Sequence, residues 1–221
     1  MRSLTLCLLM VSISCTVFAM PFPWLEVESL PTDLIAFESD FVQGNTFFVI
    51  TGSGELYRST DSGDSWNSLP TPDGKALKLL KREPRQSQAW YGVTESGGNF
   101  EVWFTPDNCT SWEFRGNPGG EVRYLIPSEL AQGILLCAVQ GGDSMLDLRK
   151  SEDGGVTWNH VFSGSDPGFA PVWHTTSVWQ AHWGYFVSRD YGESWQQEAS
   201  KSITACGYDV PPSLLAPTNS G

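Results

Sequence analysis

The chain has 221 residues, of which 40% are hydrophobic, and its formal net charge is −12 at pH 7. This length allows one substantial buried core that does not depend on disulfides for stability. The excess of negative charge repels phosphate backbones and anionic lipids, which argues against nucleic acid and membrane surfaces as partners. Such a charge favours a basic or neutral ligand instead.

The first residues have the pattern of a secretory signal peptide. Arg2 precedes an apolar run over residues 4–13, and the small residue Ala19 suits cleavage after it. The run is shorter than the about 20 residues that a membrane-spanning helix needs. We therefore expect removal of residues 1–19, no membrane insertion, and a protein that is secreted or stays in the lumen of the secretory pathway. Cleavage would leave 12 basic and 25 acidic side chains, a net charge of −13.

One eight-residue pattern, S/T-x-D-x-G-x-S/T-W, occurs four times in the chain, and we call its copies boxes 1 to 4. The aspartates of successive boxes are separated by 46, 46 and 37 residues, close to the length of one four-stranded propeller blade. Box 1 spans residues 59–66, box 2 spans 105–112, box 3 spans 151–158 and box 4 spans 188–195. Their turn-forming residues are Asp61, Gly63 and Trp66, then Asp107 and Trp112, then Asp153, Gly155 and Trp158, and finally Asp190, Gly192 and Trp195.

These residue types suit a tight hairpin. The aspartate accepts hydrogen bonds from N–H groups of its own turn, and the glycine two positions later adopts a positive φ at little cost. We expect each box tryptophan to turn inward and bury its indole in the core. In box 2 Cys109 takes the place of the glycine, so the second unit should be the least regular of the four.

Alternating apolar and polar residues predict strands on both sides of every box. Clusters of Gly, Pro, Asn and Asp separate the units, for example at residues 71–74 and 164–168, and no amphipathic helix is predicted. The fold class is therefore all-β, a propeller or an open propeller arc of about four four-stranded blades. In chain order, the predicted strands are 34–37, 46–51, 55–59 and 65–69; 77–81, 89–94, 100–105 and 111–114; 122–126, 134–139, 146–150 and 157–162; 172–176, 178–181, 184–188 and 194–197.

Three cysteines, Cys109, Cys137 and Cys206, remain after cleavage. At most one pair among them forms a disulfide within the chain, which leaves one thiol over. Their spacing does not resemble a metal site, and we expect neither a metal nor a cofactor. Asn108 opens the sequon Asn-Cys-Thr and is a candidate for glycosylation.

Trp173, Trp179 and Trp183 crowd into the last unit together with His174 and His182. If they are exposed on one face, these rings would stack against a sugar or a peptide. The ordinary alternative, that they fill the core between blades, is the one we favour, because large aromatic rings dominate such burial. The histidines have no recognised ligand spacing.

The four boxes resemble the Asp-box, or bacterial neuraminidase repeat, over roughly residues 25–200. The run Glu55-Leu56-Tyr57-Arg58 before box 1, and the form Ser-x-Asp-Gly-Gly-x-Thr-Trp of box 3, are most similar to the sortilin N-terminal type, with sialidase-like propellers second. The resemblance implies an Asp-box propeller over residues 20–205, followed by a tail over 206–221. It also implies that the boxes lie at the outer edges of the blades, away from the ligand.

The resemblance implies a binding or interaction module for a protein, a peptide or a glycan. One alternative is a sialidase-like or other glycoside hydrolase, which needs paired carboxylates or a tyrosine nucleophile with an arginine cluster. Asp33, Asp40, Glu83 and Glu121 show no spacing that singles out such a pair, so an enzyme is not favoured and no catalytic residue is assigned. Another alternative is an assembly subunit, because an open arc exposes strand edges that invite self-association.

Overall fold

The computed structural model describes residues 33–40, 42–129, 131–140, 145–165, 172–174, 177–182, 184–188, 190 and 193–199. The predicted signal peptide and the predicted tail lie outside these residues, as do Trp183, Gly192 and Cys206. Trp173 and Trp179 lie on described strands, but their side chains are outside the description. The ligand-facing role considered for these three tryptophans therefore stays a prediction.

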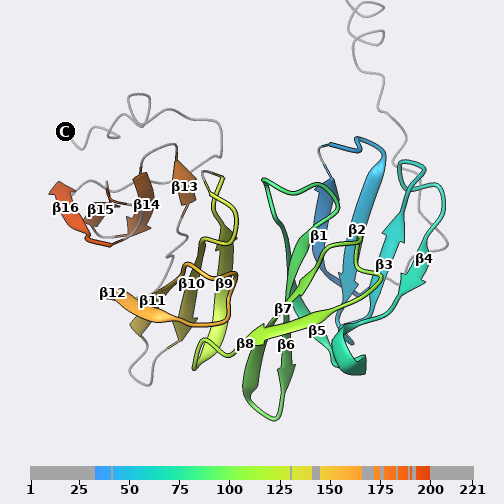
Figure 1. Cartoon of the computed structure of the whole chain (residues 1–221), viewed down its shortest axis with the longest axis horizontal. Coiled ribbons are helices and arrows are strands. Elements are labelled where there is room, and N and C mark those ends of the chain that lie inside the picture. The colour runs from blue at the N-terminus through green and yellow to red at the C-terminus, as the bar shows by residue number, and fades with distance from the viewer. Residues whose placement is uncertain are drawn as a thin grey trace, which may run out of the picture. The chain divides into compact units, whose positions relative to one another are not determined.

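The described residues form four four-stranded antiparallel sheets, each with its strands in chain order (Figure 1). The predicted all-β fold is confirmed, and the described residues contain one short 3-10 helix, Pro72–Gly74, and no α-helix. Sheet 1 consists of β1 (Leu34–Asp40), β2 (Thr46–Thr51), β3 (Leu56–Ser59) and β4 (Asn67–Leu69); sheet 2 of β5 (Leu77–Arg82), β6 (Trp90–Ser96), β7 (Asn99–Thr105) and β8 (Glu113–Gly116). Sheet 3 consists of β9 (Glu121–Pro127), β10 (Leu135–Gln140), β11 (Met145–Ser151) and β12 (Asn159–Ser165); sheet 4 of β13 (Val172–His174), β14 (Ser177–His182), β15 (Gly184–Ser188) and β16 (Gln196–Ala199).

Each box connects the third strand of its sheet to the fourth. The fourth strands begin later than the sequence predicted, β4 at Asn67 and β12 at Asn159. The backbone N–H of the residue before each box tryptophan bonds to the box aspartate. Ser65 N–H donates to Asp61 at 2.9 Å, and Thr157 N–H donates to Asp153 at 2.9 Å. These N–H groups are therefore not available to a strand ladder.

Apolar clusters fill the space between successive sheets, because alternate residues of a strand face opposite sides. One cluster joins sheets 1 and 2, with Phe48, Ile50 and Leu56 against Leu77, Leu80, Trp90 and Cys109. A second joins sheets 2 and 3 and includes Tyr91, Val102, Phe104, Leu125, Leu135 and Cys137. A third lies on sheet 3, where Leu136, Leu146 and Leu148 are fully buried and the box 4 residue Trp195 packs against the cluster.

The box tryptophans Trp66, Trp112, Trp158 and Trp195 are half-buried. Trp112, Trp158 and Trp195 pack against the core clusters, at the margin of the core rather than fully within it. In boxes 1 and 3 the indole Nε1 donates to the carbonyl of the box glycine, at 3.0 Å and 2.9 Å, which folds the ring back over its own turn. Among the tryptophans whose side chains the structure describes, Trp90 and Trp103 are buried, and both lie on strands.

Candidate functional site

The carboxylate of each box aspartate is committed to its own hairpin. In box 1, Asp61 Oδ1 accepts hydrogen bonds from Ser59 Oγ at 2.7 Å and from Ser65 N at 2.9 Å, and Oδ2 accepts one from Ser65 Oγ at 2.5 Å. Ser59 Oγ in turn accepts one from the Gly63 N–H at 2.8 Å. Box 3 repeats this network through Ser151, Asp153 and Thr157. A carboxylate with so many local donors is a turn element.

The same hydrogen bonds keep these aspartates ionised. The Ser65 hydroxyl, the Ser65 N–H and the Ser59 hydroxyl lower the pKa of Asp61 to about 2. For Asp153 and Asp190, desolvation is the largest single effect and would raise the pKa, but the donors of each box together outweigh it and lower the pKa to about 2. Groups held ionised in this way are poor general acids.

Box 2 makes the same hairpin although Cys109 replaces the glycine. Asp107 accepts from Thr105 Oγ1 at 2.8 Å and from Ser111 N at 2.9 Å, and Cys109 itself has a positive φ of 65°. The irregularity expected for this unit lies in its tryptophan instead. Trp112 Nε1 donates to the carbonyl of Pro70, in the segment that follows sheet 1, at 2.9 Å. Box 2 is thereby tied to its neighbouring sheet.

Cys109 and Cys137 carry free thiols and are fully buried, Cys109 between sheets 1 and 2 and Cys137 between sheets 2 and 3. Desolvation raises the pKa of both thiols, so neither is a reactive thiolate at neutral pH. The sequon residue Asn108 is half-buried, and its Oδ1 accepts a hydrogen bond from the buried Trp90 Nε1 at 3.2 Å. The side-chain oxygen of Asn108 thus anchors box 2 to the core.

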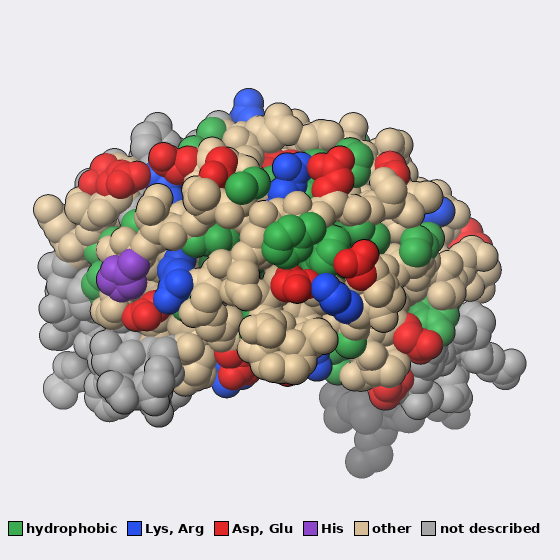
Figure 2. All heavy atoms as spheres, turned by 60° about the horizontal axis from the view of Figure 1, so that its bottom comes forward, with side chains coloured by type: hydrophobic (Ala, Val, Ile, Leu, Met, Phe, Trp, Pro, Cys, Tyr) green, Lys and Arg blue, Asp and Glu red, His purple; other side chains and the backbone are tan. Residues whose placement is uncertain are grey.

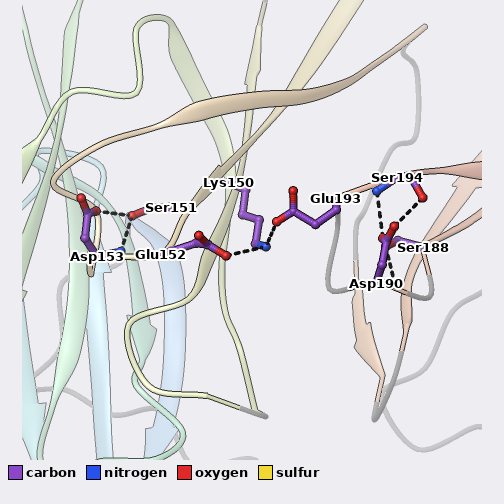
Figure 3. Close-up of polar contacts among 8 residues, drawn as sticks. All are labelled: Lys150, Ser151, Glu152, Asp153, Ser188, Asp190, Glu193 and Ser194. Carbon is purple, nitrogen blue, oxygen red and sulfur yellow. Dashed lines mark hydrogen bonds and ion pairs between the residues drawn. The ribbon is translucent and has the colours of Figure 1, made fainter.

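Lys150 connects box 3 to box 4 (Figure 3). Its side chain on β11 is only 4% exposed, and its Nζ lies 2.9 Å from Glu152 Oε1 and also pairs with Glu193. These residues line a hollow of about 250 Å³ together with Asn159, His160 and Val161. Burial, the largest effect, would lower the pKa of Lys150, but its hydrogen bonds and charge pairs with both glutamates raise the pKa overall. The lysine is therefore a charged link between sheets and not a nucleophile.

Two buried carboxylates occupy equivalent positions where the first strands of sheets 1 and 2 end. Asp40 Oδ1 accepts the Val42 N–H at 3.0 Å, and Glu83 Oε1 accepts the Arg85 N–H at 3.1 Å. Desolvation raises the pKa of Glu83, although the N–H groups of its turn partly oppose this effect. Both carboxylates therefore cap turns.

The first strand of each of sheets 1 to 3 contains a bulge at an equivalent position. Pairing shifts register between Leu34 and Ala36 on β1, between Leu77 and Leu79 on β5, and between Val122 and Tyr124 on β9. The bulges leave Ile35, Lys78 and Arg123 out of the ladder, and we call these three residues the bulge row. Such bulges often re-aim side chains at functional sites. Sequence reasoning missed the row, because only register reveals it.

The strands that carry the bulge row are neighbours. Each of β1, β5 and β9 is an edge strand of its sheet, and β5 contacts both β1 and β9. Ile35 and Arg123 are exposed and Lys78 is partly exposed. Edge strands also carry unpaired backbone donors and acceptors. The row therefore combines solvent-facing side chains with backbone groups that could pair with another chain.

The charged members of the bulge row are paired within their own sheets. Lys78 Nζ lies 3.3 Å from Glu95 Oε2, and Arg123 Nη1 lies 3.0 Å from Glu121 Oε1. The exposed ring of Tyr124 follows Arg123 on β9. Acidic, basic and hydrophobic side chains are similarly interspersed across the face of the molecule that Figure 2 shows. The surface around the row thus offers both signs of charge and apolar contact.

The described part of the chain lacks the features of two other classes of site. No group of three or more His, Cys, Asp and Glu side chains there could hold a metal ion. In the same residues, no helix has the length and apolar character needed to cross a membrane.

No protein-family model matches the chain. Among curated proteins it is similar to vacuolar protein sorting/targeting protein 10 of Aspergillus fumigatus, with 32% identity over 78 residues, 34% of this chain and 5% of that protein. The protein of the same name from Aspergillus terreus is 30% identical over 90 residues, 39% of this chain and 6% of that protein. The chain thus matches only about a twentieth of the length of these relatives.

Solved structures share the propeller fold at low identity. YCF48 from Cyanidioschyzon merolae aligns with a TM-score of 0.53 and 12% identity, over 79% of this chain and 60% of that chain. An ancestral GH74 enzyme aligns with a TM-score of 0.58 and 14% identity, over 80% of this chain and 25% of that chain. YCF48 bound to D1 peptide aligns with a TM-score of 0.50 and 20% identity, over 79% and 56%. These matches confirm the predicted fold class.

Proposed function

We propose that this chain is a binding module for a protein or a peptide in the secretory pathway, and that the bulge row forms its binding surface. One observation carries the proposal: three neighbouring edge strands are bulged at equivalent positions, which places Ile35, Lys78 and Arg123 outside the ladders. A bulge in one strand is a local irregularity. Three bulges at equivalent positions of neighbouring strands are a repeated surface feature, and repeated surfaces of this kind suit an extended ligand.

The charges around the bulge row decide which ligand fits. The chain carries a net charge of −12, which attracts a basic segment, does not oppose a neutral one and repels an acidic one. Glu95 and Glu121, the partners of Lys78 and Arg123, are themselves exposed enough to pair with a basic ligand. Ile35, in the row, and Tyr124, next to its member Arg123, are exposed and can add apolar contact. We therefore infer a basic or neutral peptide segment as the ligand.

The relatives support this class of function. The protein of Aspergillus fumigatus is named for sorting and targeting, and one of the matched YCF48 structures has a bound peptide. A sortilin-like role in capturing cargo, with secretion or retention in the lumen after cleavage at Ala19, is the specific form of the proposal. The box resemblance to sortilin N-terminal domains points the same way.

The test uses the full chain and three labelled synthetic peptides of repeating Lys-Gly, Ser-Gly and Glu-Gly. In fluorescence anisotropy we expect the basic or neutral peptide to bind, the acidic peptide to bind more weakly, and added salt to weaken the basic complex. The same binding by all three peptides, or by none, would contradict the proposal. So would turnover of fluorogenic sialosides or β-glucosides by the purified protein.

Substitutions then test the location of the surface. Changing Glu95 and Glu121 to Gln should weaken the basic complex, and Tyr124→Ala should weaken any complex that uses apolar contact. Glu113→Gln is the matched control, because Glu113 is an exposed glutamate that pairs with Arg115 at 3.0 Å on β8, outside the row. Binding that responds equally to the control and to the row variants would place the surface elsewhere.

A further inference from the structure

Box 2 contains a sequon that the proposed binding surface does not use. The triplet Asn108-Cys109-Thr110 is the only Asn-x-Ser/Thr triplet in the chain. An N-linked sugar is bonded to the side-chain nitrogen of the sequon asparagine. Whether the folded chain can carry such a sugar therefore depends on where Asn108 Nδ2 lies.

The hydrogen bond from Trp90 fixes the orientation of the Asn108 amide. An indole N–H can only donate, so the amide atom that it meets at 3.2 Å is the oxygen Oδ1, and Nδ2 is the other branch of the amide. Trp90 is fully buried, whereas Asn108 is half-buried. The amide thus turns its oxygen to the core and its nitrogen away from the core.

The nitrogen of this amide is free and reaches solvent. Within the described residues, the hydrogen bonds of Asn108 use Oδ1, the backbone N–H and the backbone carbonyl, and none uses Nδ2. The buried side-chain atoms without a partner in the same part of the chain belong to three arginines and Trp195, so Nδ2 is not one of them. Thr110 in the box and Gln88 in the adjacent loop are exposed. A sugar on Nδ2 would project into solvent and leave the bond from Trp90 intact.

The folded hairpin encloses the rest of the sequon. Cys109 is fully buried, and its N–H donates to Thr105 Oγ1 at 3.1 Å. The Thr110 hydroxyl donates to the carbonyl of Asp107 at 2.9 Å, and the Thr110 N–H donates to Asp107 Oδ1 at 3.0 Å. Asn108 and Cys109 have positive φ angles of 57° and 65°. An enzyme that reads both ends of the triplet needs this segment free, so it can act only before box 2 closes.

We propose that Asn108 carries an N-linked oligosaccharide, which is transferred before box 2 folds and is then displayed by the folded hairpin. The inference rests on the part of the proposed function that places the chain in the secretory pathway. In the transfer step, Asn108 Nδ2 forms a bond to the anomeric carbon of an oligosaccharide linked to a lipid diphosphate. The bond from that carbon to the diphosphate oxygen breaks, the lipid diphosphate leaves with the electron pair, and the amide proton passes to a base of the transferase.

The sugar lies apart from the bulge row. Box 2 connects β7 to β8, and the Asn108 N–H donates to the carbonyl of Gln88 at 2.7 Å, in the loop that follows β5. Lys78, the member of the bulge row on this sheet, lies at the opposite end of β5 from that loop. Peptide binding at the bulge row should therefore be the same with and without the sugar.

The experiment produces the full chain in a eukaryotic secretory host and measures the intact mass before and after endoglycosidase treatment. We expect loss of residues 1–19, a mass above that of the processed chain, and a sugar on the proteolytic peptide that contains Asn108. Thr110→Ala should abolish the addition, and Thr110→Ser, which keeps the sequon, should retain it. Thr110 is the residue to change because it is exposed, whereas changing Asn108 would remove the bond from Trp90.

A matched control places the same sequon in box 1. Ser62 is at the position equivalent to Asn108, is exposed and has a φ of 64°, so the double variant Ser62→Asn and Asp64→Thr should gain a second sugar. A variant with a sugar in box 1 and none at Asn108 would overturn the proposal. So would a secreted chain with no sugar in either box, or a chain that keeps residues 1–19 and is not secreted.

The order of transfer and folding has its own test. The chain without residues 1–19, folded after production in bacteria, is incubated with a purified oligosaccharyltransferase and a lipid-linked oligosaccharide, beside a synthetic peptide of residues 104–114. We expect the peptide to be modified and the folded chain to stay unmodified. Modification of both at the same rate would overturn the stated order. Because peptide binding at the bulge row is measured separately, loss of either proposal leaves the other distinguishable.

Discussion

Boxes 2 and 3 form the same hairpin with different residues at the position of the glycine. Gly155 in box 3 has a φ of 92°, and a Cβ there would lie 3.1 Å from Val102 Cγ1 and 3.3 Å from Leu135 Cδ1. Cys109 in box 2 has a φ of 65° and a fully buried side chain between sheets 1 and 2. The comparison teaches that the aspartate and its hydroxyl partners define the hairpin, while the adjacent sheet decides whether a side chain fits.

The tryptophans of boxes 2 and 3 differ in whether they bond within their own box or to a neighbouring segment. Trp158 Nε1 donates to Gly155 of its own box at 2.9 Å, so box 3 closes on itself. Trp112 Nε1 donates to Pro70 instead, at 2.9 Å, and the ring packs over Gly92, where a Cβ would lie 2.9 Å from Cζ3. Box 2 therefore depends on its neighbours more than box 3 does.

Trp90→Ala should have the largest effect on stability, because it removes contacts through which box 2 depends on its neighbours. Trp90 is fully buried, its ring lies 4.5 Å from that of Phe48, and it holds Asn108 of box 2. We expect a loss of about 3–5 kcal/mol in the free energy of unfolding, measured by chemical denaturation. Leu135→Ala removes the equivalent residue of sheet 3. Hydrogen exchange of the box amides should rise more in box 2 of the first variant than in box 3 of the second, and equal effects would contradict the comparison.

Gly155→Ala tests whether the adjacent sheet decides what fits. The positive φ costs an alanine about 1–2 kcal/mol, and the crowded Cβ adds about 1–3 kcal/mol. At Gly63 the nearest atom to a Cβ is 3.9 Å away, so Gly63→Ala should show only the backbone cost. Thermal and chemical unfolding of both variants provide the measurement. If the two variants are equally stable, crowding by the neighbouring sheet does not determine which residue is tolerated at the glycine position of a box.

Trp112→Phe should have a smaller effect. It keeps an aromatic ring over Gly92 but removes the hydrogen bond to Pro70, which contributes about 1 kcal/mol. Trp66→Phe removes a bond within box 1 and is the matched control. We expect similar losses of stability but different local changes, with faster hydrogen exchange at the sheet 1 to sheet 2 junction only for Trp112→Phe. Faster exchange there in both variants would contradict the difference between the boxes.

Acidification should have the smallest effect, because solvent screens the box carboxylates. The pKa of Asp61 is about 2 in the folded chain and 3.8 ordinarily, so its ionised form stabilises the fold above pH 3.8. That contribution is lost as pH falls from about 4 to about 2. Asp61→Asn should flatten the fall in melting temperature over this interval, and Asp64→Asn, which removes one charge from the same turn, is the matched control. A steeper fall in the Asp61 variant would contradict this account.

The strands and the boxes were predictable because their signals are local. The side chains of Ser59 and Asp61 each accept an N–H group four residues further on, and the Ser65 hydroxyl donates to Asp61, so the hairpin depends on a short window of sequence. Alternation of apolar residues placed the strands close to their observed bounds. The partial exposure of the box tryptophans was not predicted, because an indole N–H also needs an acceptor, which in boxes 1 and 3 is the carbonyl of the box glycine.

The sequence by itself determined four box hairpins, the strands around them and an all-β fold, since each depends on residues near one another in the chain. Only the tertiary structure decided that Cys109 is buried, that Ile35, Lys78 and Arg123 leave their ladders at equivalent positions, and that Phe37 on β1 is exposed where its equivalents on β5 and β9, Leu80 and Leu125, are covered. These features depend on register and on which sheet lies against which. Neither is encoded in a short window of sequence, because register depends on how neighbouring strands pair, as Leu34 pairs with Thr51, and packing depends on contacts between different sheets.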